Sequence, residues 1–139
     1  MNPCHAKSFQ ELRVYQKSCV VSQAVFRVTR AFPREEMYSL TDQFRRSARS
    51  IGSQIAEAWG KRRYEKHFVS KLSDADAEQL ETQHWVSEAI ACGYLAAAEG
   101  KWLNSQLEEI GQMLGAMMKK ADSFCRLPGG VIQHDATDN

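Results

Sequence analysis

Residues 102–125 read WLNSQLEEIGQMLGAMMKKADSFC, and this stretch decides the fold. Its apolar side chains recur at alternating spacings of three and four residues, at Leu103, Leu107, Ile110, Leu114, Met117, Ala121 and Phe124. This spacing is the seam of an α-helix that packs into a left-handed bundle. The stretch therefore predicts a helix over residues 102–125 that buries one side against other helices.

Helical periodicity also runs through most of the remaining chain, and strand-like alternation is absent. The helical pattern is interrupted at Pro33, Gly60, Gly93 and Gly100, since both residue types disfavour the helix interior. Helices are predicted over residues 8–31, 34–60, 64–92 and 102–125. Ser8 and Glu11 match a capping box for the first helix. Short connections favour an all-α, up-down-up-down antiparallel four-helix bundle. Residues 1–7 and 126–139 are expected to be a flexible N-terminus and a flexible tail.

Composition restricts the class of protein. The chain has 139 residues, of which 43% are hydrophobic, enough for one domain with its own core. No apolar run reaches the roughly 18 residues of a membrane span, and the first residues lack the apolar segment of a signal peptide. We therefore expect a cytoplasmic protein without a membrane partner.

The residues that usually carry metal or covalent chemistry are scattered. Four cysteines and four histidines show no paired spacing typical of zinc sites. Glu81 and His84 form one Glu-x-x-His motif, whereas a di-iron bundle needs two. No phosphate loop or nucleophile–base pair is recognisable. We expect free thiols, no metal, no cofactor and no catalytic residue, which means that the protein is not an enzyme.

The first predicted helix carries apolar residues on two nearly opposite sides. One stripe holds Leu12, Tyr15, Cys19 and Phe26, and the other holds Val14, Val21, Val25, Val28 and Phe32. One side can pack in its own bundle, and the other then needs a second covering, most simply another subunit. The predicted oligomer interface comprises Val14, Val21, Val25, Val28, Gly52 and Ala56.

Gly52 lies in a ridge of small residues on the second predicted helix, between Ala48 and Ala56. A glycine inside a helix costs about 1 kcal/mol relative to alanine. Close approach of another helix would explain Gly52, and a merely tolerated glycine is the alternative.

The formal charge of +1 conceals a division of the chain. Residues 1–73 hold 14 basic and 6 acidic groups, a net +8, and residues 74–139 hold 4 basic and 11 acidic groups, a net −7. Near-neutrality therefore does not argue against a surface that binds nucleic acid.

The basic residues concentrate on the second helix and just after it. The candidate nucleic-acid-binding residues are Arg45, Arg46, Arg49, Lys61, Arg62, Arg63 and Lys66. Such side chains contact phosphates, and the nearby Trp59 and Tyr64 offer rings on which bases stack. The alternatives are an ordinary solvated face, or ion pairing with an acidic helix face (Asp74, Glu78, Glu81, Glu88) across a subunit contact.

Three motifs in the second quarter of the chain resemble a known family. Phe32-Pro33-Arg34-Glu35-Glu36 is followed by Leu40-Thr41-Asp42-Gln43-Phe44-Arg45-Arg46-Ser47-Ala48 and by Ser50-Ile51-Gly52-Ser53-Gln54-Ile55-Ala56-Glu57. Together they are similar to the four-helix-bundle family of the 23S rRNA intervening-sequence protein, over about residues 8–125. The positions that match the family motif are Phe32, Pro33, Glu36, Leu40, Thr41, Gln43, Arg46, Ser50, Ile51, Ile55, Ala56 and Glu57. The chain departs from it at Ala58, where the family has Gly, and at Gly52, where it often has Pro.

The resemblance implies a cytosolic bacterial bundle that assembles into a ring, commonly a homopentamer, with RNA binding as an expected activity. The family is also similar to accessory proteins of diversity-generating retroelements, which bind a reverse transcriptase. The favoured function is therefore a non-enzymatic oligomer that binds RNA or DNA through its basic surface. The alternatives are an accessory scaffold for a reverse transcriptase and a purely structural assembly module.

Overall fold

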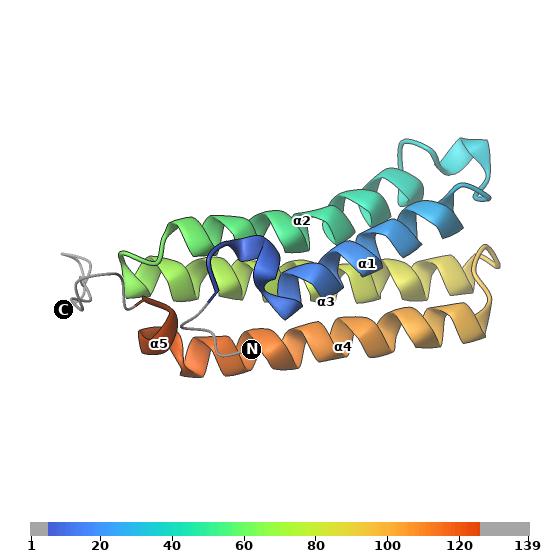
Figure 1. Cartoon of the computed structure of the whole chain (residues 1–139). Coiled ribbons are helices and arrows are strands. Elements are labelled where there is room, and N and C mark those ends of the chain that lie inside the picture. Colours follow the sequence, from blue (N-terminus) through green and yellow to red (C-terminus); the bar gives the residue numbers. More distant parts are fainter. Residues whose placement is uncertain (1–5, 126–139) are drawn as a thin grey trace.

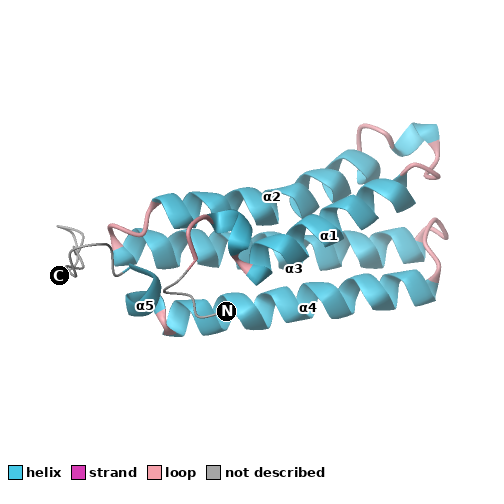
Figure 2. Ribbon diagram, in the orientation of Figure 1, coloured by secondary structure: helices cyan, strands magenta, loops and turns pink. Residues whose placement is uncertain are grey.

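The computed structural model describes residues 6–125, and in that part of the chain all regular secondary structure is helical. Four long helices pack against one another (Figure 1): α1 (Arg13–Thr29), α2 (Leu40–Gly60), α3 (Glu65–Ala91) and α4 (Ala97–Lys119). Short elements flank them (Figure 2), namely the 3-10 turns η2 (Phe9–Glu11) and η3 (Arg34–Glu36) and the final short helix α5 (Ala121–Cys125). The predicted all-α bundle is confirmed. The predicted tail at 126–139, and residues 1–5 of the predicted N-terminus, lie outside the described residues.

The core follows the seam predicted on α4. Leu103, Leu107, Ile110 and Leu114 are at most 1% exposed, and they meet fully buried residues of the other three long helices: Val21, Val25, Phe44, Ile51, Ile55, Phe68, Leu72 and Val86. The most extensive contact joins α2 to α3, and the contact between α1 and α4 is sparser. The bundle is therefore packed unevenly and is least closed along α1 and α4.

Three helix boundaries differ from the predicted ones at the N-terminal side of their helices. The helix predicted over 34–60 is divided into η3 and α2, which begins at Leu40. The predicted capping box is wrong: the Ser8 side chain makes no capping hydrogen bond, and Glu11 instead accepts one from the backbone N–H of Lys7. Leu12 is extended and separates η2 from α1, so the continuous helix predicted over 8–31 is split. The fourth long helix begins at Ala97 rather than residue 102.

Gly100 explains why α4 begins earlier than predicted. It lies inside α4, buried against Ile90 and Val86 of α3 so closely that an added Cβ would collide with the Ile90 side chain. The glycine permits helix packing and does not mark a connection. At the other end of α4, Lys120 leaves the helical conformation, with φ −108° and ψ 28°. The predicted helix over 102–125 therefore breaks before α5.

Polar side chains form a layer inside the bundle, at the middle of α3. The amide of Gln79, 4% exposed, donates to Asp76 at 3.0 Å and accepts from Gln83 at 2.8 Å. Gly111 of α4 faces this group, and an added Cβ would lie 2.9 Å from Gln79 Nε2. The partners that buried amides require thus come largely from α3 itself, and Gly111 leaves the space for them.

Candidate nucleic-acid interface

The seven candidate basic residues fall into two groups, which α2 holds apart. Arg45, Arg46 and Arg49 lie in its first half, whereas Lys61, Arg62, Arg63 and Lys66 lie at its exit and in the first turn of α3. At 1.5 Å per residue, Arg49 and Lys61 are separated by about 18 Å along the helix. The predicted single surface is therefore two surfaces.

The first group, here called the arginine cluster (Arg45, Arg46, Arg49), borders a shallow depression that Asp42, Ser50 and Ser53 also line. Arg45 donates from Nε to the Thr29 hydroxyl at 2.8 Å. Its guanidinium lies 4.8 Å from the centroid of the Phe26 ring, and that of Arg49 lies 5.6 Å from it. Arg45 and Arg49 are thus oriented by α1, through cation–π contact with one exposed ring.

Arg46 points to the other neighbour of α2. Its Nη1 lies 3.6 Å from Glu78 Oε2, and its Nη2 pairs with Glu81. Glu81 also accepts from the Trp85 indole at 3.1 Å. The acidic face of the third helix therefore pairs with Arg46 within one chain, so Arg46 holds α2 to α3. Glu57 likewise pairs with α3, through Lys71 at 3.4 Å.

The second group belongs to a larger set, here called the basic end (Lys61, Arg62, Arg63, Lys66, Lys119 and Lys120). The α2–α3 turn and the end of α4 lie at the same end of the bundle (Figure 1), where α5 packs on α3. Lys61, Arg63, Lys66, Lys119 and Lys120 are exposed. Sequence reasoning missed Lys119 and Lys120 at the end of α4, because more than fifty positions separate them from Lys66 and only the fold brings them near it.

The two aromatic candidates at this end differ in what covers them. The Arg62 guanidinium lies 3.5 Å from the centroid of the Trp59 ring, and Arg62 Nε donates to the Trp59 carbonyl at 2.8 Å. Trp59 is half-buried, and one face of its ring is taken, so it is a poor stacking platform. Tyr64 is 38% exposed, and its ring centroid lies 5.7 Å from that of His67. Burial lowers the pKa of Arg62, because a guanidinium that is withdrawn from water is less stable in its charged form.

The residues of the predicted oligomer interface lie mostly inside the chain. Val14, Val21 and Val25 are at most 2% exposed, and Val28 is half-buried against the core. A Cβ added to Gly52 would lie 3.0 Å from Ser18 Oγ of α1. Gly52 therefore accommodates this chain's own first helix, and it lines a groove between α1 and α2 together with Ala56. The burial of Val14, Val21 and Val25 corrects their placement against a second subunit. For Val28, Gly52 and Ala56, which are partly exposed, that placement stays a prediction.

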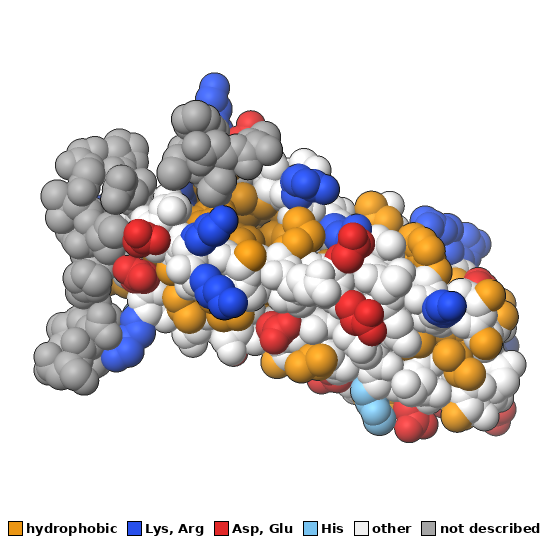
Figure 3. All heavy atoms as spheres, turned by 90° about the horizontal axis from the view of Figure 1, so that it is seen from below, with side chains coloured by type: hydrophobic (Ala, Val, Ile, Leu, Met, Phe, Trp, Pro, Cys, Tyr) orange, Lys and Arg blue, Asp and Glu red, His pale blue; other side chains and the backbone are white. Residues whose placement is uncertain are grey.

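Apolar side chains are exposed elsewhere. Val20 is 49% exposed, Phe26 39%, Leu80 55% and Trp102 45%. Of the two stripes of the first helix, the valine stripe thus faces the core, and Phe26 of the other stripe is exposed. Figure 3 shows apolar patches between charged side chains on the face seen there.

Three positions of the family motif, Phe32, Pro33 and Glu36, lie in the connection between α1 and α2, and the other nine lie in α2. Phe32, Leu40, Thr41, Ile51 and Ile55 are buried. Glu36 accepts hydrogen bonds from the Ser39 hydroxyl at 2.7 Å and from the Tyr94 hydroxyl at 3.0 Å. These bonds, with a smaller one from the backbone N–H of Leu40, lower the pKa of Glu36. The motif thus fixes η3 against the loop that follows α3.

Chemistry at thiols or metal ions finds no arranged site in residues 6–125. No group of three or more His, Cys, Asp or Glu side chains is placed there to hold a metal ion. Burial is the main cause that raises the pKa of the Cys125 thiol to about 11, which keeps it protonated near neutral pH. Within the same residues, no helix is long and apolar enough to cross a bilayer.

Comparisons with known proteins agree with this architecture. A family model described as "23S rRNA-intervening sequence protein" matches residues 10–116. A crystal structure from Bacteroides thetaiotaomicron, of a protein with unknown function from the S23 ribosomal protein family, is similar with a TM-score of 0.69. It is 26% identical, and the match covers 76% of this chain and 98% of that chain. None of the curated proteins matches the chain. Because the family model matches most of its length, the chain belongs to the 23S rRNA-intervening sequence protein family.

Proposed function

We propose that this chain is a non-enzymatic protein that binds RNA or DNA through the basic end of its bundle. The observation that carries the proposal is the meeting of two segments: the α2–α3 turn and the end of α4 present exposed lysines and an arginine around the same end. Lysine and arginine side chains on one surface supply the phosphate contacts on which nucleic-acid affinity chiefly depends.

Tyr64 adds a contact of a second kind. It precedes α3, next to Arg63, and more than a third of its surface is exposed. Bases of single strands stack on such rings, whereas the bases of a duplex are not accessible to them. The preferred ligand is therefore single-stranded, and single-stranded RNA is the first choice because of the family.

Self-association is the second part of the proposal. Val20, Phe26, Leu80 and Trp102 present apolar surface to solvent in a single chain, which is typical of surfaces that another molecule covers. The family resemblance favours a ring of five copies. Such a ring would present five basic ends, and simultaneous contacts would raise the overall affinity.

The test of nucleic-acid binding is fluorescence anisotropy with a labelled single-stranded RNA, measured at several salt concentrations. The variant K61E/R63E/K119E reverses three exposed charges and leaves Arg62 on Trp59. We expect the affinity to fall at least about tenfold and the salt dependence to become shallower. The control R27E/R30E reverses two exposed charges of the first-helix segment, outside the basic end, and should have a smaller effect.

Two results would contradict the proposal. Equal affinities of the triple variant and the unaltered protein would remove the basic end as the interface. Cleavage of the RNA, seen on a denaturing gel after incubation, would contradict the non-enzymatic part. Native mass spectrometry tests self-association separately, and a monomer at micromolar concentration would contradict it.

A further inference from the structure

A pocket opens where the sparse contact between α1 and α4 ends, and of the basic end only Lys120 borders it. Its volume is about 200 Å³. The residues that line it are Ala6, Glu11, Leu12, Arg13, Val14, Met113, Ala116, Met117, Lys120 and Phe124. It is here called the α1–α4 pocket. An engineered cavity of about 150 Å³ in another protein binds benzene, so this volume suits a small ligand rather than a large one.

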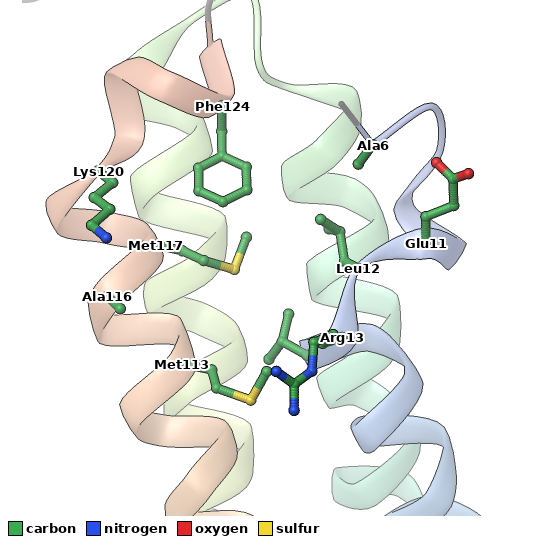
Figure 4. A pocket seen from close by; sticks show the side chains of 10 residues that line it. Ala6, Glu11, Leu12, Arg13, Met113, Ala116, Met117, Lys120 and Phe124 are labelled. Carbon is green, nitrogen blue, oxygen red and sulfur yellow. The ribbon is translucent and has the colours of Figure 1, made fainter. Parts of the chain in front are cut away.

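Two local breaks in the helices create the pocket. The extended residue Leu12 turns η2 away from the axis of α1, and the break at Lys120 redirects α5 across the end of α4. Phe124 of α5 stacks on Phe68 of α3, with 5.8 Å between the ring centroids. Figure 4 shows the Phe124 ring, Met117 and Leu12 directed toward the same space.

The walls of the pocket are apolar and deformable. Leu12, Val14, Met117 and Phe124 are at most 8% exposed, and Met113 is half-buried. Methionine side chains are flexible and polarizable, so they adapt to ligands of different outline. An apolar body of several carbon atoms therefore fits between α4 and the start of α1.

The charged residues that line the pocket differ in where their side chains point and in whether they already have a hydrogen-bond partner. Glu11 accepts a hydrogen bond from the backbone N–H of Lys7, and its carboxylate points away from the pocket in Figure 4. Arg13 and Lys120 line the pocket from α1 and from the end of α4. Within residues 6–125, neither side chain has an ion pair or a hydrogen bond. Figure 4 shows the Arg13 guanidinium between α1 and Met113, whereas Lys120 lies on the side of α4 that faces away from Met117 and Phe124. The pocket thus combines apolar walls with one cation, Arg13, that has no ion pair among the described residues.

We infer that the α1–α4 pocket binds a small amphipathic carboxylate, whose apolar part lies against Met113, Met117 and Phe124 and whose carboxylate is held by Arg13. Guanidinium groups recognise carboxylates through paired, charge-assisted hydrogen bonds. The positive charge selects an anion over an alcohol of the same length, and the apolar walls select it over acetate.

The test uses the full-length protein with 13C-labelled methionine methyl groups and n-octanoate as the probe. We expect the methyl signals of Met113 and Met117 to shift to saturation during the titration, while the signal of Met37, next to η3 and outside the pocket, stays unchanged. n-Octanol, which lacks the charge, should bind about tenfold more weakly.

A charge variant distinguishes recognition of the carboxylate from nonspecific hydrophobic binding. R13Q should lower the affinity for octanoate about tenfold, to the level of octanol, and leave octanol binding unchanged. The control R30Q removes one exposed charge outside the pocket and should change neither affinity. Circular dichroism melts establish that both variants fold.

Three outcomes overturn the inference. The first is the absence of shifts at Met113 and Met117 with octanoate. The second is equal binding of octanoate and octanol, or an R13Q variant that binds octanoate normally, because Arg13 then does not select the anion. The third is movement of the two signals when the protein is diluted without octanoate, since a second copy of the chain would then occupy the pocket.

Discussion

Arg46 of α2 reaches Glu78 of α3 across the helix pair, with 3.6 Å between Nη1 and Oε2. The same guanidinium pairs with Glu81, so one cation faces two carboxylates. Burial raises the pKa of Glu78, and the charge of Arg46 opposes this increase. The residue that the sequence offered as a ligand for phosphate thus has a structural task that would persist without any nucleic acid.

Replacing Arg46 with glutamine should destabilise the fold, because Glu78 and Glu81 would face each other without a cation. We expect the free energy of unfolding in urea to fall by about 1 kcal/mol. Lys17→Gln is the matched control, since it breaks the single exposed pair with Glu109 and should cost less than about 0.5 kcal/mol. Equal costs would show that the two carboxylates do not depend on Arg46.

The effect of Arg46→Gln should also depend on pH, through Glu78. A pKa that is raised in the folded protein favours folding below the ordinary value of 4.5, and this contribution is lost as the pH rises through the folded-state value. Losing Arg46 raises the folded-state pKa of Glu78 further. The stability difference between variant and unaltered protein should therefore be smaller below pH 4.5 than at neutral pH, as urea unfolding at both pH values would reveal. A constant difference would mean that Glu78 does not titrate in this way.

Glu36 should behave in the opposite sense. Its pKa is lowered chiefly by the Ser39 hydroxyl and next by Tyr94, so its contribution to stability is present above 4.5 and is lost as the pH falls through the folded-state value. Carbon-detected NMR titration should show that Ser39→Ala raises the pKa of Glu36 more than Tyr94→Phe does. Identical titration curves in the three proteins would contradict the hydrogen-bond assignment.

Two glycines of α4 should respond in opposite directions to alanine. No atom lies within 4 Å of a Cβ added at Gly115, so Gly115→Ala should stabilise the helix by about 0.5–1 kcal/mol. At Gly100 the added Cβ meets Ile90 and lies 3.3 Å from Val86 Cγ1, so Gly100→Ala should destabilise the fold by roughly 1–3 kcal/mol. Thermal melts at one fixed protein concentration measure both, and stabilisation by Gly100→Ala would refute the close packing.

The sequence predicts the packing correctly where a helix carries a single apolar stripe. The seam of α4 has a single orientation that buries it, and its residues Leu103, Leu107, Ile110 and Leu114 are buried as expected. The first helix has two apolar stripes, and periodicity cannot say which one faces the core. The valine stripe is buried because it packs in the chain's own bundle, and a pattern within one helix carries no information about that choice.

The sequence predicts the candidate site only in part, because the pattern within one helix does not say which neighbouring helix a side chain contacts. Spacing along α2 places Arg45 and Arg46 next to each other, yet one packs on Phe26 of α1 and the other pairs with Glu78 of α3. Lys119 and Lys120 join the basic end through tertiary structure alone. The cover of Arg62 on Trp59 likewise depends on side-chain conformation, which residue identity does not specify.

The polar layer around Gln79 has a consequence for how α4 aligns with α3. A seam of apolar residues at three and four repeats every seven positions, so it would accept a helix that has slid by one such repeat. Sliding α4 in this way would bring Asn104 or Met118 to the place of Gly111, where even a Cβ would lie 2.9 Å from Gln79 Nε2. The buried amide of Gln79 and the glycine opposite it therefore select one alignment of α4 on α3 among those that the apolar repeat allows.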